Sequence, residues 1–178
     1  MKLNLRIAFH YASVWFQQAE AANCIEETYR DVVLLKKIIK RNPKIIQVLQ
    51  NPSIPGAKKQ DIFSNVVAPH VHQLTRTFFS ILITKRREAY FLVIIKQILE
   101  HYNAHHQIQV ARVTTAFKLP ASLVTRMEDM VRNMKACKSV FLKQRVDPNL
   151  LGGFILKVGD QQLDHSLAHK LTMLKNIW

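Results

Sequence analysis

Residues 146–164 read VDPNLLGGFILKVGDQQLD, and this segment holds three of the chain's four glycines and three of its twelve acidic residues. A phosphate-binding loop needs glycines at a set spacing followed by Lys and Ser or Thr, so that backbone N–H groups surround the phosphates, and this segment lacks that order. Pro148 and Asn149 instead predict a turn between two strands. Gly152 and Gly153 predict a bulge or a close backbone approach where the second strand begins. The segment therefore indicates tight β-structure.

The acidic residues of the segment are also predicted to be structural. Asp147 lies at the end of a predicted strand, Asp160 lies with Gly159 in the next turn, and Asp164 is predicted to cap a final helix. In all three places Asp commonly bonds to backbone groups. No paired base or nucleophile is spaced near them, so we expect no catalytic site here.

The sequence around this segment predicts a small α/β domain. QIQVARVTTAF (107–117) is rich in β-branched residues and apolar on both faces, which favours a strand at the centre of a sheet. Pro120 opens a helix whose Met-rich stripe predicts core filling. SVFLKQRV (139–146) alternates cleanly and predicts a second strand, and GFILKVG (153–159) predicts a third. We therefore expect a β-α-β-β-α domain over residues 106–178.

Residues 1–105 show a different pattern, in which apolar residues recur at the three-and-four spacing of amphipathic helices. The stripes are interrupted by RNPK (41–44), by NPSIPG (51–56) and by two further polar joints. Six helices with short joints predict a six-helix bundle. The run AYFLVII (89–95) is apolar on nearly every face, so its helix is expected to be the most buried.

Composition and charge limit the possible classes of protein. The chain has 178 residues, 48% of them hydrophobic, and a formal net charge of +14 that is spread over both predicted domains. Its longest apolar run, 89–95, is far shorter than the roughly 20 residues of a membrane-spanning helix. His10 and Gln17 interrupt the apolar N-terminal segment, so we expect no signal peptide and a cytoplasmic location. Cys24 and Cys137 are too far apart in sequence to indicate a disulfide framework or a zinc site.

The C-terminal segment closely resembles the signature of the delta subunit of bacterial F-type ATP synthase, the family of the mitochondrial oligomycin-sensitivity-conferring protein. The N-terminal HYASVWFQQA (10–19) is similar to the family's opening helix, and residues 51–63 and 82–102 resemble its middle segments. The resemblance thus covers almost the whole chain. The residues that carry the C-terminal signature are Val146, Asp147, Pro148, Leu150, Leu151, Gly152, Gly153, Gly159, Asp160, Asp164 and Ser166.

The resemblance implies a non-catalytic stator subunit that joins the catalytic head to the peripheral stalk and resists rotor torque during ATP synthesis. It implies that residues 1–105 bind N-terminal helices of the alpha subunits and that residues 106–178 bind the b subunits. It further implies a peripheral position on the cytoplasmic face of the cell membrane, with no cofactor and no direct nucleotide binding. For the alpha-subunit groove the family suggests the first and fifth helices, on which we expect Tyr11, Trp15, Leu74 and Phe78 to contribute or else to be core residues.

The main alternative is a basic helical nucleic-acid-binding protein. Basic clusters at 36–44, 57–60 and 84–90 could each contact phosphates. These clusters also lie at predicted helix ends, where Lys and Arg suit the helix dipole. No recognition motif accompanies the charge, so nucleic acid is not the expected partner.

A metal-dependent enzyme is a weaker alternative. The histidines include three sets with close spacing, and two imidazoles at positions i and i+4 can chelate a metal. No H-E-x-x-H motif or third carboxylate completes a catalytic zinc set, and no base is spaced near either cysteine. We therefore expect no catalytic residues and no metal ligands. The three histidine sets are His70 with His72, His101 with His105 and His106, and His165 with His169.

Overall fold

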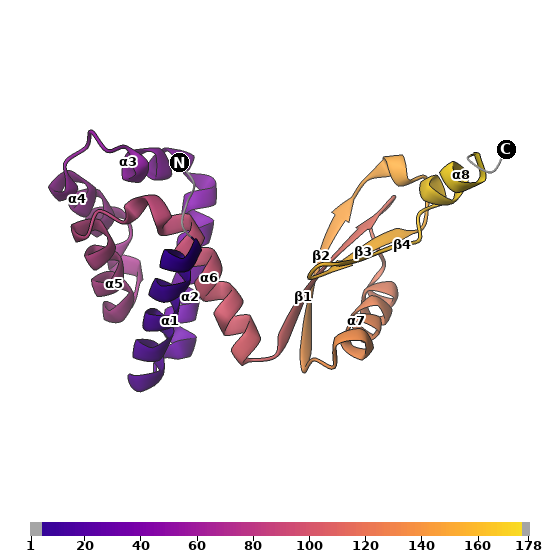
Figure 1. The fold of residues 1–178 in the computed structure, drawn as a ribbon, viewed down its shortest axis with the longest axis horizontal. Helices are drawn as coiled ribbons and strands as arrows, with labels where there is room; N and C mark the ends of the chain where they lie inside the picture. Colours follow the sequence, from indigo (N-terminus) through magenta and orange to yellow (C-terminus); the bar gives the residue numbers. More distant parts are fainter. Residues whose placement is uncertain (1–4, 176–178) are drawn as a thin grey trace. The chain divides into compact units, whose positions relative to one another are not determined.

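The computed structural model describes residues 5–175, and the chain divides into two compact units, residues 1–102 and 103–178 (Figure 1). The boundary falls three residues before the predicted one, inside a helix. The described residues are mostly helical, with one small four-stranded mixed sheet. Within residues 5–105 the α-helices are α1 (Leu5–Ala21), α2 (Ile25–Arg41), α3 (Pro43–Gln50), α4 (Gly56–Val66), α5 (Gln73–Thr84) and α6 (Phe91–His105).

The helices of the first unit pack around a core of aromatic and aliphatic side chains. Helix α2 packs against α1, α3 and α5, and α4 packs against α5. The rings of Phe79 and Phe91 lie 4.3 Å apart, and Phe63 of α4 contacts both rings. Burial of such large side chains supplies most of the stability of a helical unit of this size.

The first unit also contains a buried ion pair. Lys59 of α4 is almost completely buried, and its ammonium group lies 2.5 Å from a carboxylate oxygen of Glu88. Glu88 begins the short 3₁₀ helix η2 (Glu88–Tyr90), so the pair joins α4 to the segment that precedes α6. A charge buried in this way is tolerated only while its partner remains in place.

The apolar run 89–95 was predicted to form the most buried helix. Helix α6 buries five of its fifteen residues, a share that α5 equals with four of twelve and that exceeds the share in the other α-helices described in the first unit. The run follows a turn in which Arg86 has a φ of 54°, and it is divided between η2 and α6. Helix α6 is amphipathic: Phe91, Ile94 and Ile98 are buried, whereas Leu92 is 40% exposed.

The second unit is a sheet with strands in the order β2-β1-β3-β4. Strands β1 and β2 are parallel and are connected through α7, and the β1–β3 and β3–β4 pairs are antiparallel. Strand β1 therefore lies inside the sheet, as its two apolar faces predicted. The elements are β1 (Ile108–Thr115), α7 (Ala121–Lys135), β2 (Ser139–Val146), the 3₁₀ helix η3 (Pro148–Leu150), β3 (Phe154–Val158), β4 (Gln161–Asp164) and α8 (Leu167–Lys175).

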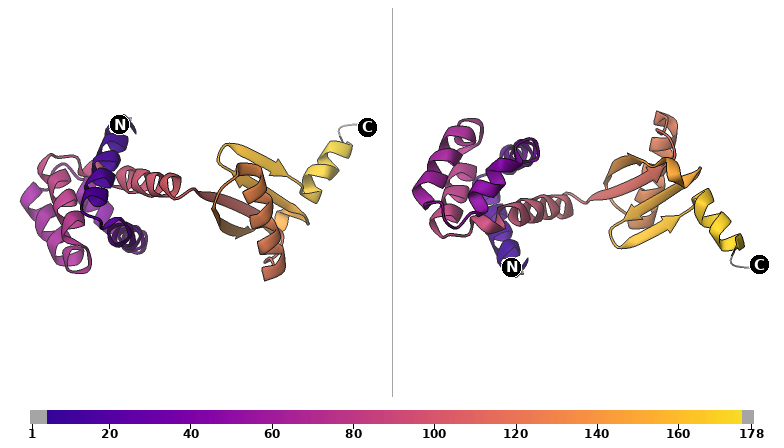
Figure 2. Two further views of the ribbon diagram at one scale, coloured as in Figure 1. Left: turned by 90° about the horizontal axis from the view of Figure 1, so that it is seen from below. Right: turned by 90° about the horizontal axis from the view of Figure 1, so that it is seen from above.

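Helix α7 covers one face of this sheet, where the core of the second unit lies (Figure 2). Ala111 and Val113 of β1 face α7, together with Leu156 of β3, and Val131 is the residue of α7 that is fully buried against them. The Met-rich stripe of α7 was predicted to fill the core. This prediction is wrong for Met130 and Met134, which are exposed, because the buried side of α7 is centred on Val131.

The predicted β-α-β-β-α order lacks one strand. Residues 161–164 form β4, which pairs with β3 through the turn at Gly159 and Asp160. The predicted turn at Pro148 does lie between two strands. It is a 3₁₀ helix that carries the chain past β1, because β2 and β3 lie on opposite sides of that strand.

Candidate docking surfaces

Helices α1 and α5 meet along an aromatic contact. The ring centroids of Tyr11 on α1 and Phe78 on α5 lie 6.3 Å apart in an edge-to-face arrangement. Leu74 lies one turn before Phe78, and all three side chains are half-buried. The structure therefore brings these three predicted residues to neighbouring positions where each keeps some exposed area.

Trp15 lies apart from this set. Its side chain has no exposed area, and its indole N–H is buried without a hydrogen-bond partner among the residues that the structure describes. The helical stripe alone could not separate Trp15 from Tyr11, since both lie on the apolar side of α1. The structure places Trp15 in the core, the alternative that the sequence left open for it.

A depression opens beside Tyr11 on α1. Its volume is about 500 Å³, and Val14 on its wall is partly exposed. Two arginines and a histidine make its rim basic. Leu74 and Phe78 do not line it, so Tyr11 is the predicted residue that contributes to it. The lining residues are Arg6, Ile7, His10, Tyr11, Val14 and Arg87.

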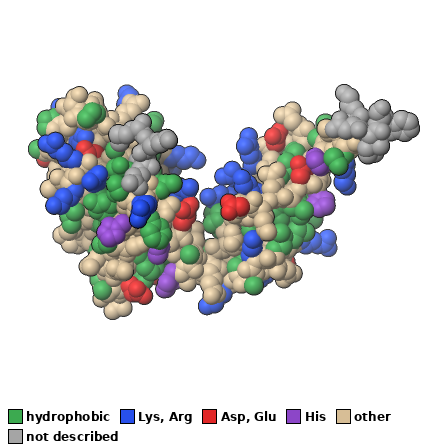
Figure 3. Space-filling model, in the orientation of Figure 1, with side chains coloured by type: hydrophobic (Ala, Val, Ile, Leu, Met, Phe, Trp, Pro, Cys, Tyr) green, Lys and Arg blue, Asp and Glu red, His purple; other side chains and the backbone are tan. Residues whose placement is uncertain are grey.

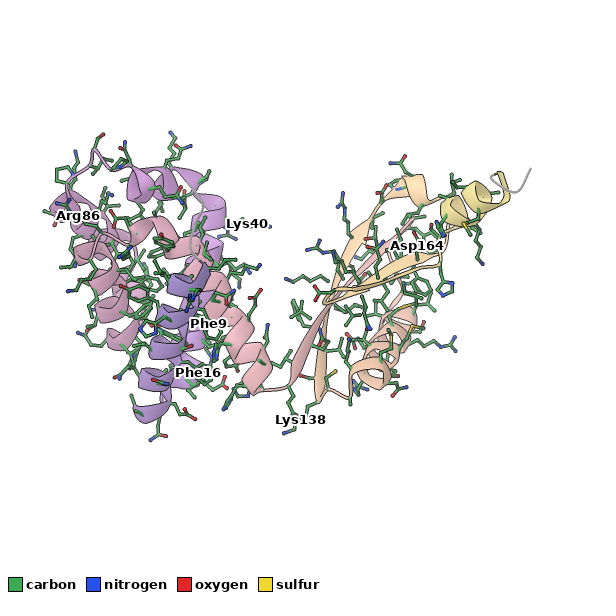
Figure 4. The ribbon with its side chains drawn as sticks, in the orientation of Figure 1. Phe9, Phe16, Lys40, Arg86, Lys138 and Asp164 are labelled. Carbon is green, nitrogen blue, oxygen red and sulfur yellow. The ribbon has the colours of Figure 1, made fainter. Side chains whose placement is uncertain are left out.

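Helix α1 also carries apolar side chains outside its core stripe, which the sequence analysis did not single out. Phe9 is 54% exposed, and its ring lies 5.6 Å from the ring of His101 on α6. Phe16 contacts the same imidazole at 5.5 Å and is buried (Figure 4). In the sequence, Leu5 and Phe9 lie four residues apart and outside the core stripe. This spacing could have indicated exposed apolar side chains on one side of the helix.

In the second unit, the signature residues Asp147 and Pro148 shape the end of β2. The Asp147 carboxylate accepts a hydrogen bond from the Asn149 backbone N–H at 3.1 Å, and the Asp147 N–H donates to the carbonyl of Thr115 at 2.8 Å. Pro148 begins η3. A backbone N–H at this first position would have no hydrogen-bond partner within the helix, so its absence in proline costs nothing. These contacts are backbone contacts and do not form a reactive site.

The paired glycines allow α8 to approach the start of β3. A Cβ atom on Gly153 would lie 2.1 Å from the backbone oxygen of His165, and Gly153 has a φ of 74°. A Cβ atom on Gly152 would lie 2.7 Å from the side chain of Leu167. Gly153 therefore lacks the space for a larger residue, whereas at Gly152 only the end of the exposed Leu167 side chain would have to move.

Asp164 and Ser166 organise the start of α8. The Asp164 carboxylate accepts a hydrogen bond from the Ser166 N–H at 2.9 Å, and bonds from Ser166 hold the pKa of Asp164 below its usual value. Ser166 is buried, and its hydroxyl accepts a hydrogen bond from the N–H of His169 at 3.1 Å. The prediction that Asp164 caps this helix is wrong: Asp164 ends β4, and Ser166 makes the capping bond.

Within residues 5–175 the structure gathers no set of three or more His, Cys, Asp or Glu side chains able to hold a metal ion. None of the helices described there is long and apolar enough to cross a membrane.

A family model described as the ATP synthase delta (OSCP) subunit matches residues 7–177. The chain belongs to this family. The subunit delta of ATP synthase from Amoebophilus asiaticus is 34% identical over 172 residues, which cover 97% of this chain and 94% of that protein. The corresponding subunit from Cytophaga hutchinsonii is 30% identical over 176 residues, covering 96% of this chain and 93% of that protein.

The same fold is found in a solved structure. A chain of the Toxoplasma gondii mitochondrial ATP synthase hexamer superposes with a TM-score of 0.74 at 19% identity, over 96% of both chains. The delta (OSCP) subunit is a structural stator component of ATP synthase, so this chain is a stator subunit and not an enzyme. Nothing in these comparisons supports the nucleic-acid alternative.

Proposed function

We propose that this chain links the catalytic head of an ATP synthase to its peripheral stalk, with one unit holding each partner. In this proposal α1–α6 act together as a single six-helix bundle that grips N-terminal helices of the alpha subunits. The second unit holds the b subunits, at the cytoplasmic face of the membrane. The observation that carries the proposal is the match to the delta (OSCP) family over residues 7–177.

The contact between α1 and α5 supports the assignment of the first unit. Tyr11, Leu74 and Phe78 are half-buried and close together, as expected of side chains at the rim of a groove for an amphipathic helix. Aromatic residues in such positions often supply much of the binding energy of an interface. Trp15 is buried and is not part of the proposed contact.

Mechanical load explains why a stator subunit needs tight packing. Torque on the linked head is resisted only if the chain transmits force without unfolding. In this proposal the buried aromatic core of Phe63, Phe79 and Phe91 supplies that resistance in the first unit.

The test is a titration of the full-length chain with a labelled peptide of the alpha-subunit N-terminus from the same source. The variant Tyr11→Ala with Leu74→Ala is expected to lose about 2 kcal/mol of binding free energy, the scale of an interface hot spot. Ile81→Ala is the matched control, because Ile81 is an exposed apolar residue of the same helix α5. Equal affinity of the two variants would show that the α1–α5 contact does not hold the alpha subunit.

A further inference from the structure

The sheet of the second unit has a second face, opposite the face that α7 covers. Side chains alternate between the two faces of a strand, so the residues of β1 next to the buried Ala111 and Val113 point away from α7. Residues of β2 and β3 that are paired with these residues of β1 lie on the same face of the sheet. We define the open face by six of its residues: Arg112, Phe141, Lys143, Arg145, Ile155 and Lys157.

Three cations form a row across the open face. In the register of the sheet, Arg112 lies directly opposite Lys143 on β2 and directly opposite Lys157 on β3. Neighbouring strands are about 4.8 Å apart, and like charges placed directly opposite one another destabilise a sheet. All three side chains are exposed, and none forms an ion pair with a residue in the described part of the chain.

A fourth cation and two apolar residues flank the row. Arg145 lies two residues beyond Lys143 on the same strand and is also exposed. Phe141 is 57% exposed, and the ammonium group of Lys143 lies 5.8 Å from its ring centroid. Ile155 is half-buried beside the row on β3. Blue side chains gather beside β2, away from α7, in Figure 3.

No carboxylate balances this charge within the row. Asp164 lies opposite Ile155 on β4, at the far edge of the sheet. Its carboxylate already accepts the Ser166 N–H at 2.9 Å. The open face is therefore a basic surface with apolar margins, and the repulsion within its cation row would be relieved by an anionic partner.

We propose that the open face binds an acidic amphipathic helix of the peripheral stalk. This inference deepens the proposed function and rests on it for the assignment of the second unit to the stalk. Carboxylates on successive turns of a helix are about 5.4 Å apart, close to the strand spacing, so a helix lying across the strands can place one carboxylate at each cation of the row. The apolar side of that helix covers Phe141 and Ile155, and the sheet then has a helix on both faces.

Single-stranded nucleic acid is the competing partner for a basic sheet. Sheets that bind it stack two or three bases on aromatic side chains. In the described strands, the open face offers one aromatic residue, Phe141, and its other apolar side chains are aliphatic. The observations therefore favour the acidic helix.

The test uses the full-length chain and the soluble part of the b subunit from the same source, with binding followed by fluorescence anisotropy at low and moderate salt. The face variant combines Arg112→Gln, Lys143→Gln and Lys157→Gln. The control variant combines Lys118→Gln, Lys135→Gln and Lys138→Gln, which remove the same charge from exposed positions of the same unit outside the open face (Figure 4 labels Lys138). The face variant should bind about tenfold more weakly at low salt, and the control within about twofold of the unaltered chain.

Equal affinity of the two variants would overturn the inference while leaving the stalk contact itself intact. If the unaltered chain does not bind the b subunit, the proposed stalk contact fails, and the open face is then judged with a helical peptide bearing Glu on successive turns and its Gln counterpart. Binding of the Glu peptide that the face variant loses supports the open face as an acidic-helix site. Absence of that binding, or face-dependent binding of oligo(dT) in its place, overturns it.

Folding of the variants provides an independent check. The single substitution Arg112→Gln removes the central charge of the row, so its thermal midpoint should equal or exceed that of the unaltered chain. A lower midpoint would contradict the repulsion from which the inference starts.

Discussion

Replacing Gly153 with alanine is expected to destabilise the second unit, because two separate effects add at this position. An alanine at a φ of 74° is strained by about 1–2 kcal/mol relative to glycine. Its Cβ would also lie 2.1 Å from the His165 backbone oxygen, so the junction of β3 and α8 must move by about 1 Å. Such overpacking adds about 1–3 kcal/mol, for a total of about 2–5 kcal/mol.

Two other glycines serve as matched controls. Gly159 has a φ of 58° but open space around it, so Gly159→Ala should show the backbone strain alone, about 1–2 kcal/mol. Gly56 has open space and no positive φ at the start of α4, so Gly56→Ala should stabilise the first unit by about 0.4–1 kcal/mol. The three substitutions separate strain, overpacking and chain entropy.

The assay is urea-dependent hydrogen exchange, read by mass spectrometry on peptides from β1 and β3, because these strands report on the second unit alone. With a urea dependence of about 1–3 kcal/mol per molar, the overpacking cost should shift the unfolding midpoint of these peptides in Gly153→Ala by about 0.3–3 M beyond the shift in Gly159→Ala. Equal shifts for the two variants would refute the close approach of His165 to Gly153.

Three further predictions test other contacts. Ser166→Ala should lower the stability of the second unit by about 1 kcal/mol, as loss of a helix cap does, and the same exchange assay measures it. Burial and the hydrogen bonds to Glu26 raise the pKa of Tyr102 to about 12, so the stability from this group is complete below pH 10 and is lost as the pH rises toward 12. Tyr102→Phe should flatten that pH dependence in circular dichroism melts; an unchanged slope would show that another group causes it. Lys59→Ala should cost about 3–5 kcal/mol by leaving the Glu88 carboxylate unpaired, while Lys59→Met with Glu88→Leu recovers most of the loss in thermal melts.

The helices and the inner strand could be predicted from sequence because each has a local pattern of apolar residues. The stripe of α1 and the two apolar faces of β1 are local patterns, and the structure contains both elements. Strand β4 could not be predicted in the same way. It has four residues, Leu163 is its one apolar side chain, and its pairing with β3 is a tertiary property.

The candidate surfaces depend still more on tertiary contacts. Trp15 and Tyr11 share one side of α1, and only tertiary packing separates the buried ring of Trp15 from the half-buried ring of Tyr11. The cation row could not be predicted from the sequence either, because Arg112, Lys143 and Lys157 become neighbours only through the register of three strands. Asp164 was assigned as a cap from its residue type, while the structure gives that bond to Ser166.

The stator role is tested most directly by ATP-driven proton pumping in membrane vesicles that carry the source organism's ATP synthase without this subunit. Adding the purified chain should restore pumping while ATP hydrolysis by the head changes little, because the chain couples the two processes and catalyses neither. Vesicles that pump equally well with and without the chain, or that never recover pumping when the intact chain is supplied, would contradict the account.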